Sequence, residues 1–173
     1  GKGTNSQSGN TVLGENALDA AVTGTNNTAI GKNAMTELTS ATGSTAVGVD
    51  ALKELTTGNG NTAVGKSALA AVTTGHSNVA IGDEAAKALL GNANVAIGDE
   101  ALKTNTTGAN NVAIGNDALK LSDTSSNNTA VGAESLAANT TGTHNVAVGY
   151  DSLTLNTTGS HNVAVGSQAL DLS

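Results

Sequence analysis

A short phrase of alternating polar and apolar residues returns ten times along the chain. It reads Asn, Thr or Val, Ala, Val or Ile, and Gly, with small variations, and its closing glycines are 17 residues apart in every interval except one of 16. The closing glycines are Gly14, Gly31, Gly48, Gly65, Gly82, Gly98, Gly115, Gly132, Gly149 and Gly166. A fixed period this short indicates one structural unit stacked on copies of itself.

The apolar residues of the phrase predict a β-strand. In Asn78–Ile81 the β-branched Val79 and Ile81 alternate with Ala80, which places them on one face and Ala80 on the other. The flanking Gly, Asn and Thr clusters are turn formers. The sequence therefore predicts an all-β repeat solenoid, a parallel β-roll or β-helix of about ten rungs of 17 residues.

The Ala-Leu part of the repeat leaves an alternative open. In Asp50–Leu55, apolar residues lie three apart among good helix formers. This spacing is also compatible with a single helical turn between strands.

Stacking would align equal repeat positions in columns along the fibre, because neighbouring strands pair residue against residue. One column is a predicted apolar core ladder, formed by Leu52, Leu69, Leu102, Leu119, Leu136 and Leu153. Another is a predicted structural ladder of amides that bond to one another or to turn backbone. Its asparagines are Asn61, Asn78, Asn94, Asn111, Asn128, Asn145 and Asn162.

The composition narrows the interior of this stack. Phe, Trp, Cys and Pro are absent, and Tyr150 is the only aromatic residue. Any core is therefore thin, and one stack alone buries little apolar area against the entropy of ordering the chain. We expect association to bury a second face, with the Ala columns in contact between chains and three chains round one axis as a homotrimer. Residues 1–173 are predicted to be a single repeat array, a segment of a longer fibre.

The net charge of −7 argues against nucleic acid as a partner and against an anionic membrane surface. No apolar run reaches the roughly 20 residues of a membrane span, so membrane insertion is not expected. The lack of cysteine removes disulfides and thiolate metal sites.

Acidic residues two places after the glycine form the main candidate site. They recur on consecutive rungs as Glu84, Glu100, Asp117, Glu134 and Asp151. One hypothesis is a cation-binding stripe, since stacked carboxylates could share Ca²⁺. The favoured interpretation is a solvated face whose like charges are screened by water and salt.

The other chemistry-bearing residues follow the repeat. His144 and His161 share a column, with His76 one position earlier in its own turn, but no third metal ligand accompanies them. Because the polar residues occupy repeat positions, no catalytic constellation stands out, and neither an enzyme nor a cofactor is expected. Thr-Thr pairs such as Thr56-Thr57 suggest an ice-binding solenoid as an alternative, although they precede a glycine in a predicted turn.

One rung departs from the pattern. The rung from Gly82 is a residue short, carries Leu89-Leu90-Gly91 in place of Thr-Thr-Gly, and has Ala86 in the leucine column. We expect Leu89 or Leu90 to turn inward and fill the space that Ala86 leaves.

The repeat motifs resemble two groups of fibrous proteins. The phrase Asn-Val-Ala-Ile-Gly-x-x-Ala, at 78–85, 94–101 and 111–118, is similar to the head repeats of trimeric autotransporter adhesins. The phrase Asn-Thr-Thr-Gly-x-x-Asn-Val-Ala-Val-Gly, at 139–149 and 156–166, is similar to repeats of long bacteriophage tail fibres, which is the closer match.

The resemblance implies a homotrimeric extracellular shaft or spacer, on a virion tail fibre or a bacterial cell surface. Such a shaft would support attachment to a host-surface glycan or receptor through domains outside this segment. Direct binding of glycans or another surface by the repeat ladders is the first alternative, and ice binding is the second.

Overall fold

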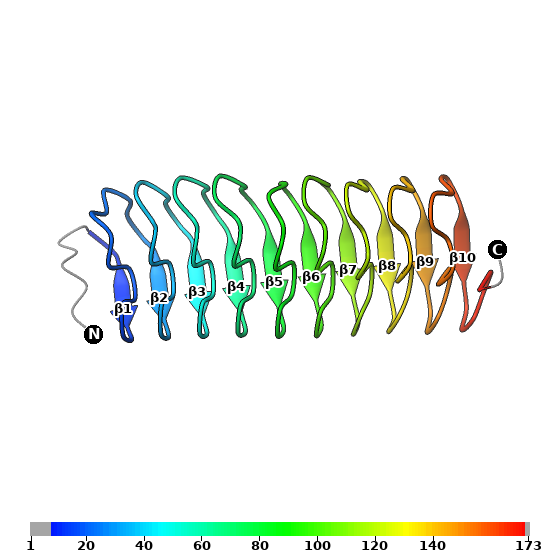
Figure 1. The fold of residues 1–173 in the computed structure, drawn as a ribbon, viewed down its shortest axis with the longest axis horizontal. Helices are drawn as coiled ribbons and strands as arrows, with labels where there is room; N and C mark the ends of the chain where they lie inside the picture. The colour runs from blue at the N-terminus through cyan, green and yellow to red at the C-terminus, as the bar shows by residue number, and fades with distance from the viewer. Residues whose placement is uncertain (1–7, 172–173) are drawn as a thin grey trace.

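The computed structural model describes residues 8–171 as one coil with a short strand on every turn (Figure 1). The predicted array over 1–173 extends to 1–7 and 172–173, which lie outside the described residues. The strands are β1 (Thr11–Leu13), β2 (Thr28–Ile30), β3 (Thr45–Val47), β4 (Thr62–Val64), β5 (Val79–Ile81), β6 (Val95–Ile97), β7 (Val112–Ile114), β8 (Thr129–Val131), β9 (Val146–Val148) and β10 (Val163–Val165). They confirm the predicted parallel β-solenoid.

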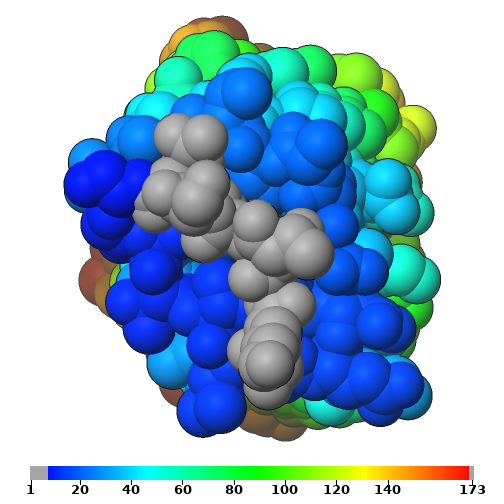
Figure 2. Space-filling model, turned by 90° about the vertical axis from the view of Figure 1, so that its left-hand side faces the viewer, coloured from blue at the N-terminus to red at the C-terminus, as the bar shows by residue number. Residues whose placement is uncertain are grey.

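The ten strands form one parallel sheet in the order β1 to β10. Each residue pairs with its equivalent in the next rung, as Val95 does with Val112. Seen from the N-terminal end, the later rungs emerge only round the rim of the first (Figure 2). One sequence repeat therefore corresponds to one rung of the coil.

The short rung keeps this register, since Val79 still pairs with Val95. The missing residue is taken from the Thr-Thr turn. The Leu90 amide donates to the Thr106 carbonyl, as the Thr106 amide donates to the Asp123 carbonyl in a rung of full length. A deletion in this turn therefore keeps the hydrogen bond between rungs and leaves the sheet unchanged.

The strand alternation is as predicted, but the role expected for its alanines is wrong. The central alanine of each strand from β2 to β10, such as Ala80 or Ala113, is buried inside the coil. The β-branched neighbours, such as Val112 and Ile114, point outward and are half-buried. The alanines before each leucine, such as Ala101, are fully buried as well. Because the interior is narrow, both Ala columns pack within one chain and are closed to contacts between chains.

The predicted core ladder is confirmed. Leu52, Leu69, Leu102, Leu119, Leu136 and Leu153 are at most 1% exposed. A second inner column, three residues after the first, was not predicted. It begins with Leu38, Leu55, Val72 and Leu89 and continues with Asn105, Ser122, Asn139 and Asn156, all buried.

Leu89 does turn inward, with no exposed surface, while Leu90 remains 45% exposed. The space left by Ala86 is not needed to explain this burial. Leu89 occupies the second inner column, where Leu55 and Val72 are buried in rungs of full length. Its burial is the ordinary state of that column.

The Ala-Leu segment forms tight turns, and residues 8–171 contain no helix. The helical alternative is therefore wrong. In each rung both the residue two after the glycine and the core leucine have left-handed backbone angles, as in Asp117 with φ 57° and Leu119 with φ 52°. No described helix is long and apolar enough to cross a membrane.

The repeat glycine is required by a close approach between rungs. Gly115 has φ 137°, and a Cβ there would collide with the carbonyl of Gly132 in the next rung. Each repeat glycine from Gly14 to Gly149 allows two turns of backbone to meet with no side chain between them.

We predict that the leucine column rejects β-branched residues because of its left-handed backbone. Leu119→Val should cost about 2 to 4 kcal/mol of unfolding free energy, from lost volume and backbone strain together. Leu119→Met should cost less than about 1.5 kcal/mol, since Met35 holds the same position at φ 53°. Urea unfolding of both variants checks this, and equal costs would contradict it.

Candidate functional site

The acidic column lies in the turn that follows each strand. Gly82, Asp83, Glu84 and Ala85 close a turn through a bond from the Ala85 amide to the Gly82 carbonyl, with Glu84 at φ 52°. The same turn recurs at Glu100, whose φ is 54°. Stacked turns bring the carboxylates of successive rungs onto one side of the coil, as the sequence predicted.

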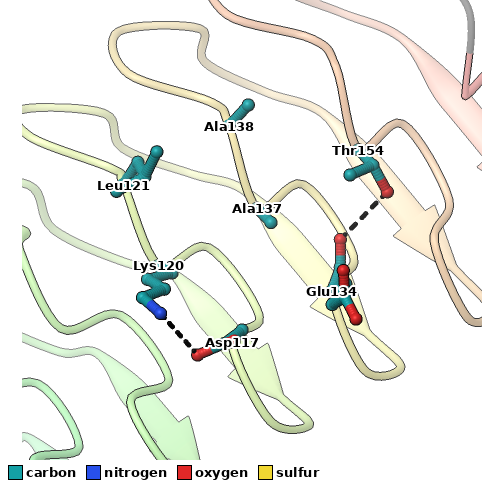
Figure 3. Close-up of a pocket in the computed structure, with 7 residues that line it drawn as sticks. All are labelled: Asp117, Lys120, Leu121, Glu134, Ala137, Ala138 and Thr154. Carbon is teal, nitrogen blue, oxygen red and sulfur yellow. Dashed lines mark hydrogen bonds and ion pairs between the residues drawn. The ribbon is translucent and has the colours of Figure 1, made fainter.

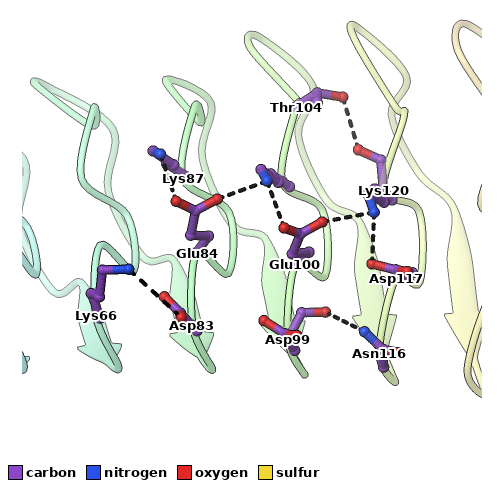
Figure 4. Close-up of polar contacts among 11 residues, drawn as sticks. Lys66, Asp83, Glu84, Lys87, Asp99, Glu100, Thr104, Asn116, Asp117 and Lys120 are labelled. Atoms are coloured by element: carbon purple, nitrogen blue, oxygen red, sulfur yellow. Dashed lines mark hydrogen bonds and ion pairs between the residues drawn. The ribbon is translucent and has the colours of Figure 1, made fainter.

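Lysines separate these carboxylates (Figure 4). Lys103 Nζ lies 2.7 Å from Glu84 Oε2 and 2.6 Å from Glu100 Oε1. Lys120 Nζ lies 2.7 Å from Glu100 Oε2 and 3.2 Å from Asp117 Oδ1. With Lys87, which lies 2.7 Å from Glu84 Oε1, they make a continuous chain across three rungs. We call it the ion-pair ladder, and its members are Glu84, Lys87, Glu100, Lys103, Asp117 and Lys120.

The ladder shifts the titration of its own groups. Hydrogen bonds from Lys103 and Lys87 lower the pKa of Glu84 to about 2. Hydrogen bonds from Lys103 and Lys120 lower the pKa of Glu100. Glu100 and Glu84 in turn raise the pKa of Lys103. Both signs of charge are therefore held ionised across the neutral pH range.

The structure places the predicted acidic residues in two different settings. Glu84, Glu100 and Asp117 are bridged by lysines, while Glu134 and Asp151 have no lysine partner among residues 8–171. The described residues contain no group of three or more side chains suited to hold a metal ion. The sequence reasoning treated the acidic column alone and missed the lysines. Their signal is a Lys three residues after the acid, as in Glu84 with Lys87.

The ladder ends where the lysine column is interrupted by Ala137. A hollow of about 330 Å³ opens there on the surface (Figure 3). Its walls are Asp117, Lys120, Leu121, Glu134, Ala137, Ala138 and Thr154. Apolar side chains form one part of the lining and carboxylates another, a combination that suits a ligand with both an apolar and a charged end.

No protein-family model, curated protein or solved structure matches this chain. The geometry of the columns and of the hollow therefore carries the functional argument.

The predicted asparagine ladder is present, and from Asn61 to Asn145 each side-chain amide is hydrogen-bonded through both its oxygen and its nitrogen. Asn111 Oδ1 accepts the backbone amide of Asn128 at 3.0 Å. Asn111 Nδ2 donates to the Ser125 carbonyl at 2.8 Å, and Asn128 Nδ2 donates to the Gly142 carbonyl at 2.9 Å. Each asparagine thus satisfies buried backbone groups of the following rung, which supports the structural role.

The second inner column leaves one polar atom without a partner. Asn156 Nδ2 donates to Asn139 Oδ1 at 3.0 Å, but Ser122 supplies no such donor to Asn105. Asn105 Oδ1 is buried and has no hydrogen-bond partner within the described structure. It lies at the border where the column changes from the apolar Leu89 to polar residues.

The imidazoles of His144 and His161 stack as their shared column predicts. Their ring centroids are 5.0 Å apart, and the planes differ by 1°. Both side chains are exposed at the turn.

The Thr-Thr pairs lie in turns, as expected from the glycine after them. The first hydroxyl of a pair donates to the next rung, as Thr56 Oγ1 does to the Thr73 carbonyl at 2.9 Å and Thr140 Oγ1 to the Thr157 carbonyl at 3.0 Å. Hydroxyls used in this way bond along the fibre, which leaves fewer of them to match ice.

We predict that Ser44→Asn stabilises the chain. Ser44 occupies the asparagine column and accepts the Asn61 amide at 3.2 Å, but its side chain is too short to donate to Gly58 as its neighbours donate to their equivalents. The new amide should add a buried hydrogen bond worth about 1 kcal/mol. Thermal unfolding should show a raised Tm, with Asn111→Ser lowering it as the reverse control. An unchanged or lowered Tm for Ser44→Asn would be the contrary outcome.

The ladder also predicts a pH dependence of stability. A carboxylate with a lowered pKa stabilises the fold above its unfolded pKa, and this contribution is lost as the pH falls through the folded value. For Glu84 the window runs from its ordinary value of 4.5 down to about 2. Glu84→Gln should therefore be less stable than the parent at pH 7 and converge with it near pH 2.

Thermal unfolding between pH 7 and pH 2, at low salt, measures this convergence. Glu54→Gln is the matched control, because Glu54 is exposed and makes no ion pair among the described residues. A constant difference between Glu84→Gln and the parent across the whole pH range would contradict the role of the ladder.

Proposed function

We propose that this chain is a structural shaft or spacer of an extracellular trimeric fibre, either a phage tail fibre or a bacterial surface adhesin. The observation that carries the proposal is the uninterrupted stack of ten strands in one register. At about 4.8 Å per strand the stack extends roughly 45 Å. Repeats that contact only their neighbours add length without changing cross-section, which is what a spacer requires.

The alanine columns are buried within one chain, so the surface that supports trimer formation is the outward face of the sheet. Two columns of side chains follow this face, and one of them is β-branched and apolar from β2 to β10. Its members are Ile30, Val47, Val64, Ile81, Ile97, Ile114, Val131, Val148 and Val165. Ile81 is 39% and Val148 36% exposed in the single chain. A continuous apolar stripe of this kind is typical of a surface that packs against another copy.

Attachment to a host-surface glycan or receptor is assigned in this proposal to domains outside the segment. The polar side chains of the asparagine and threonine columns make hydrogen bonds between rungs of this chain. The negative charge of the chain fits a solvated shaft.

Sedimentation equilibrium tests the proposal. The chain should sediment at about three times its mass of 16.7 kDa. The double variant Ile97→Lys with Ile114→Lys should sediment as a monomer with an unchanged far-UV spectrum, because charges would then lie in the apolar stripe.

The matched control is Thr107→Lys with Thr124→Lys, which adds the same charge at exposed turn positions and should remain trimeric. A parent chain that is monomeric at every concentration would refute the trimer. Binding of the isolated chain to a glycan array would favour the adhesin alternative over the shaft.

A further inference from the structure

We propose that the hollow beside Ala137 binds a primary alkylammonium group, with the charged end between Asp117 and Glu134 and the alkyl stem against Leu121 and Ala138. This inference goes beyond the structural role proposed above. It rests on a comparison of rungs within the chain and on the shape and charge of the hollow.

The rung that contains Lys103 shows how this position is filled elsewhere. Lys103 lies three residues after the acidic position of its own rung, as Ala137 does after Glu134. The Lys103 ammonium contacts the carboxylates of its own rung and of the preceding rung, at 2.6 Å from Glu100 and 2.7 Å from Glu84. Lys120 repeats the arrangement one rung further along, between Glu100 and Asp117.

The rung at Ala137 keeps both carboxylates and lacks the cation. Asp117 Oδ1 faces Lys120 Nζ at 3.2 Å, in an ion pair without hydrogen-bond geometry, since the same buried oxygen has no hydrogen-bond partner. No second lysine reaches Asp117 from the following rung, and Glu134 makes no ion pair within residues 8–171. Asp117 and Glu134 are thus the equivalents of the two carboxylates that bind the Lys103 ammonium, but within residues 8–171 no lysine bridges them.

The walls of the hollow fit the rest of such a ligand. Figure 3 shows Leu121, Ala137 and Ala138 lining the space above the two carboxylates. Leu121 is 50% exposed, and an alkyl stem packed on it would bury apolar area, as lysine stems do. The volume of about 330 Å³ accommodates a short alkyl chain.

The surrounding charges favour a cation overall. Lys120 is the one basic group in the lining, and its ammonium is already shared between Glu100 and Asp117. Asp151 lies on the next rung, where its carboxylate accepts the Thr154 hydroxyl at 3.1 Å. No lysine or arginine follows Lys120 in the sequence. The hollow therefore lies where the chain passes into a segment that has acidic side chains but no lysine or arginine.

The test is an ¹⁵N NMR titration at low salt with n-pentylammonium chloride and, separately, with Nα-acetyl-lysine amide. Amide shifts should move at Glu134, Ala137 and Ala138 and saturate in the millimolar range, as expected for an exposed ion pair with apolar contact. Stronger binding of the pentylammonium probe points to a free amine, and stronger binding of the lysine probe to a lysine side chain of another protein. Shifts for neither probe at about 50 mM would overturn the proposal.

Three variants sharpen this test. Glu134→Gln should weaken binding at least about fivefold, and unchanged binding would overturn the proposed contact. Ala137→Lys should abolish binding and raise the Tm by completing the ladder. Ala137→Met is the length-matched uncharged control and should abolish binding without that rise at neutral pH. An Ala137→Lys protein with a Tm no higher than that of Ala137→Met would overturn the assignment of an ammonium to this position, whether or not the probes bind.

Discussion

The buried asparagine column is the interaction on which the rest of the coil depends. Some backbone amides and carbonyls in the turns of a thin solenoid are buried from water, and each one left without a hydrogen bond would cost roughly 1 to 3 kcal/mol. Asn61 pairs two such groups, since its Nδ2 donates to the Gly75 carbonyl and its Oδ1 accepts the Asn78 backbone amide. Because these bonds link one rung to the next, they also fix the register. A slip by one residue would break them in every rung at once.

This constraint accounts for the residues that surround the column. The repeat glycine lets two rungs touch at their backbones, as Gly115 does with Gly132. The left-handed angle at Leu119 turns the chain so that the leucine enters the core. With the leucines inside, the narrow interior leaves room for alanine on the inner face of β2 to β10, and the larger β-branched residues face outward. The apolar stripe that we assign to trimer contacts is therefore a consequence of a narrow core.

Much of the fold could be predicted from the sequence, because a fixed period and the alternation in Asn78–Ile81 follow directly from strand geometry. Which face of the strand points inward could not be predicted, because the alternation separates two faces without indicating which one is buried. The second inner column was missed because Leu55 and Asn105 occupy equivalent positions, and a column that changes from apolar to polar has no single hydropathy signal. At the candidate site the acidic column was found, but the lysines that neutralise it were not, because spacing within one rung does not show which side chains meet between rungs.

The central claim is that the asparagine amides are buried and bonded along the fibre, and side-chain hydrogen exchange measured by NMR tests it most directly. The Nδ2 protons of Asn61, Asn111 and Asn128 should exchange at least about a hundredfold more slowly than those of Asn110 and Asn127, which are exposed on the same turns. Equal exchange rates for the two sets of asparagines would contradict the account.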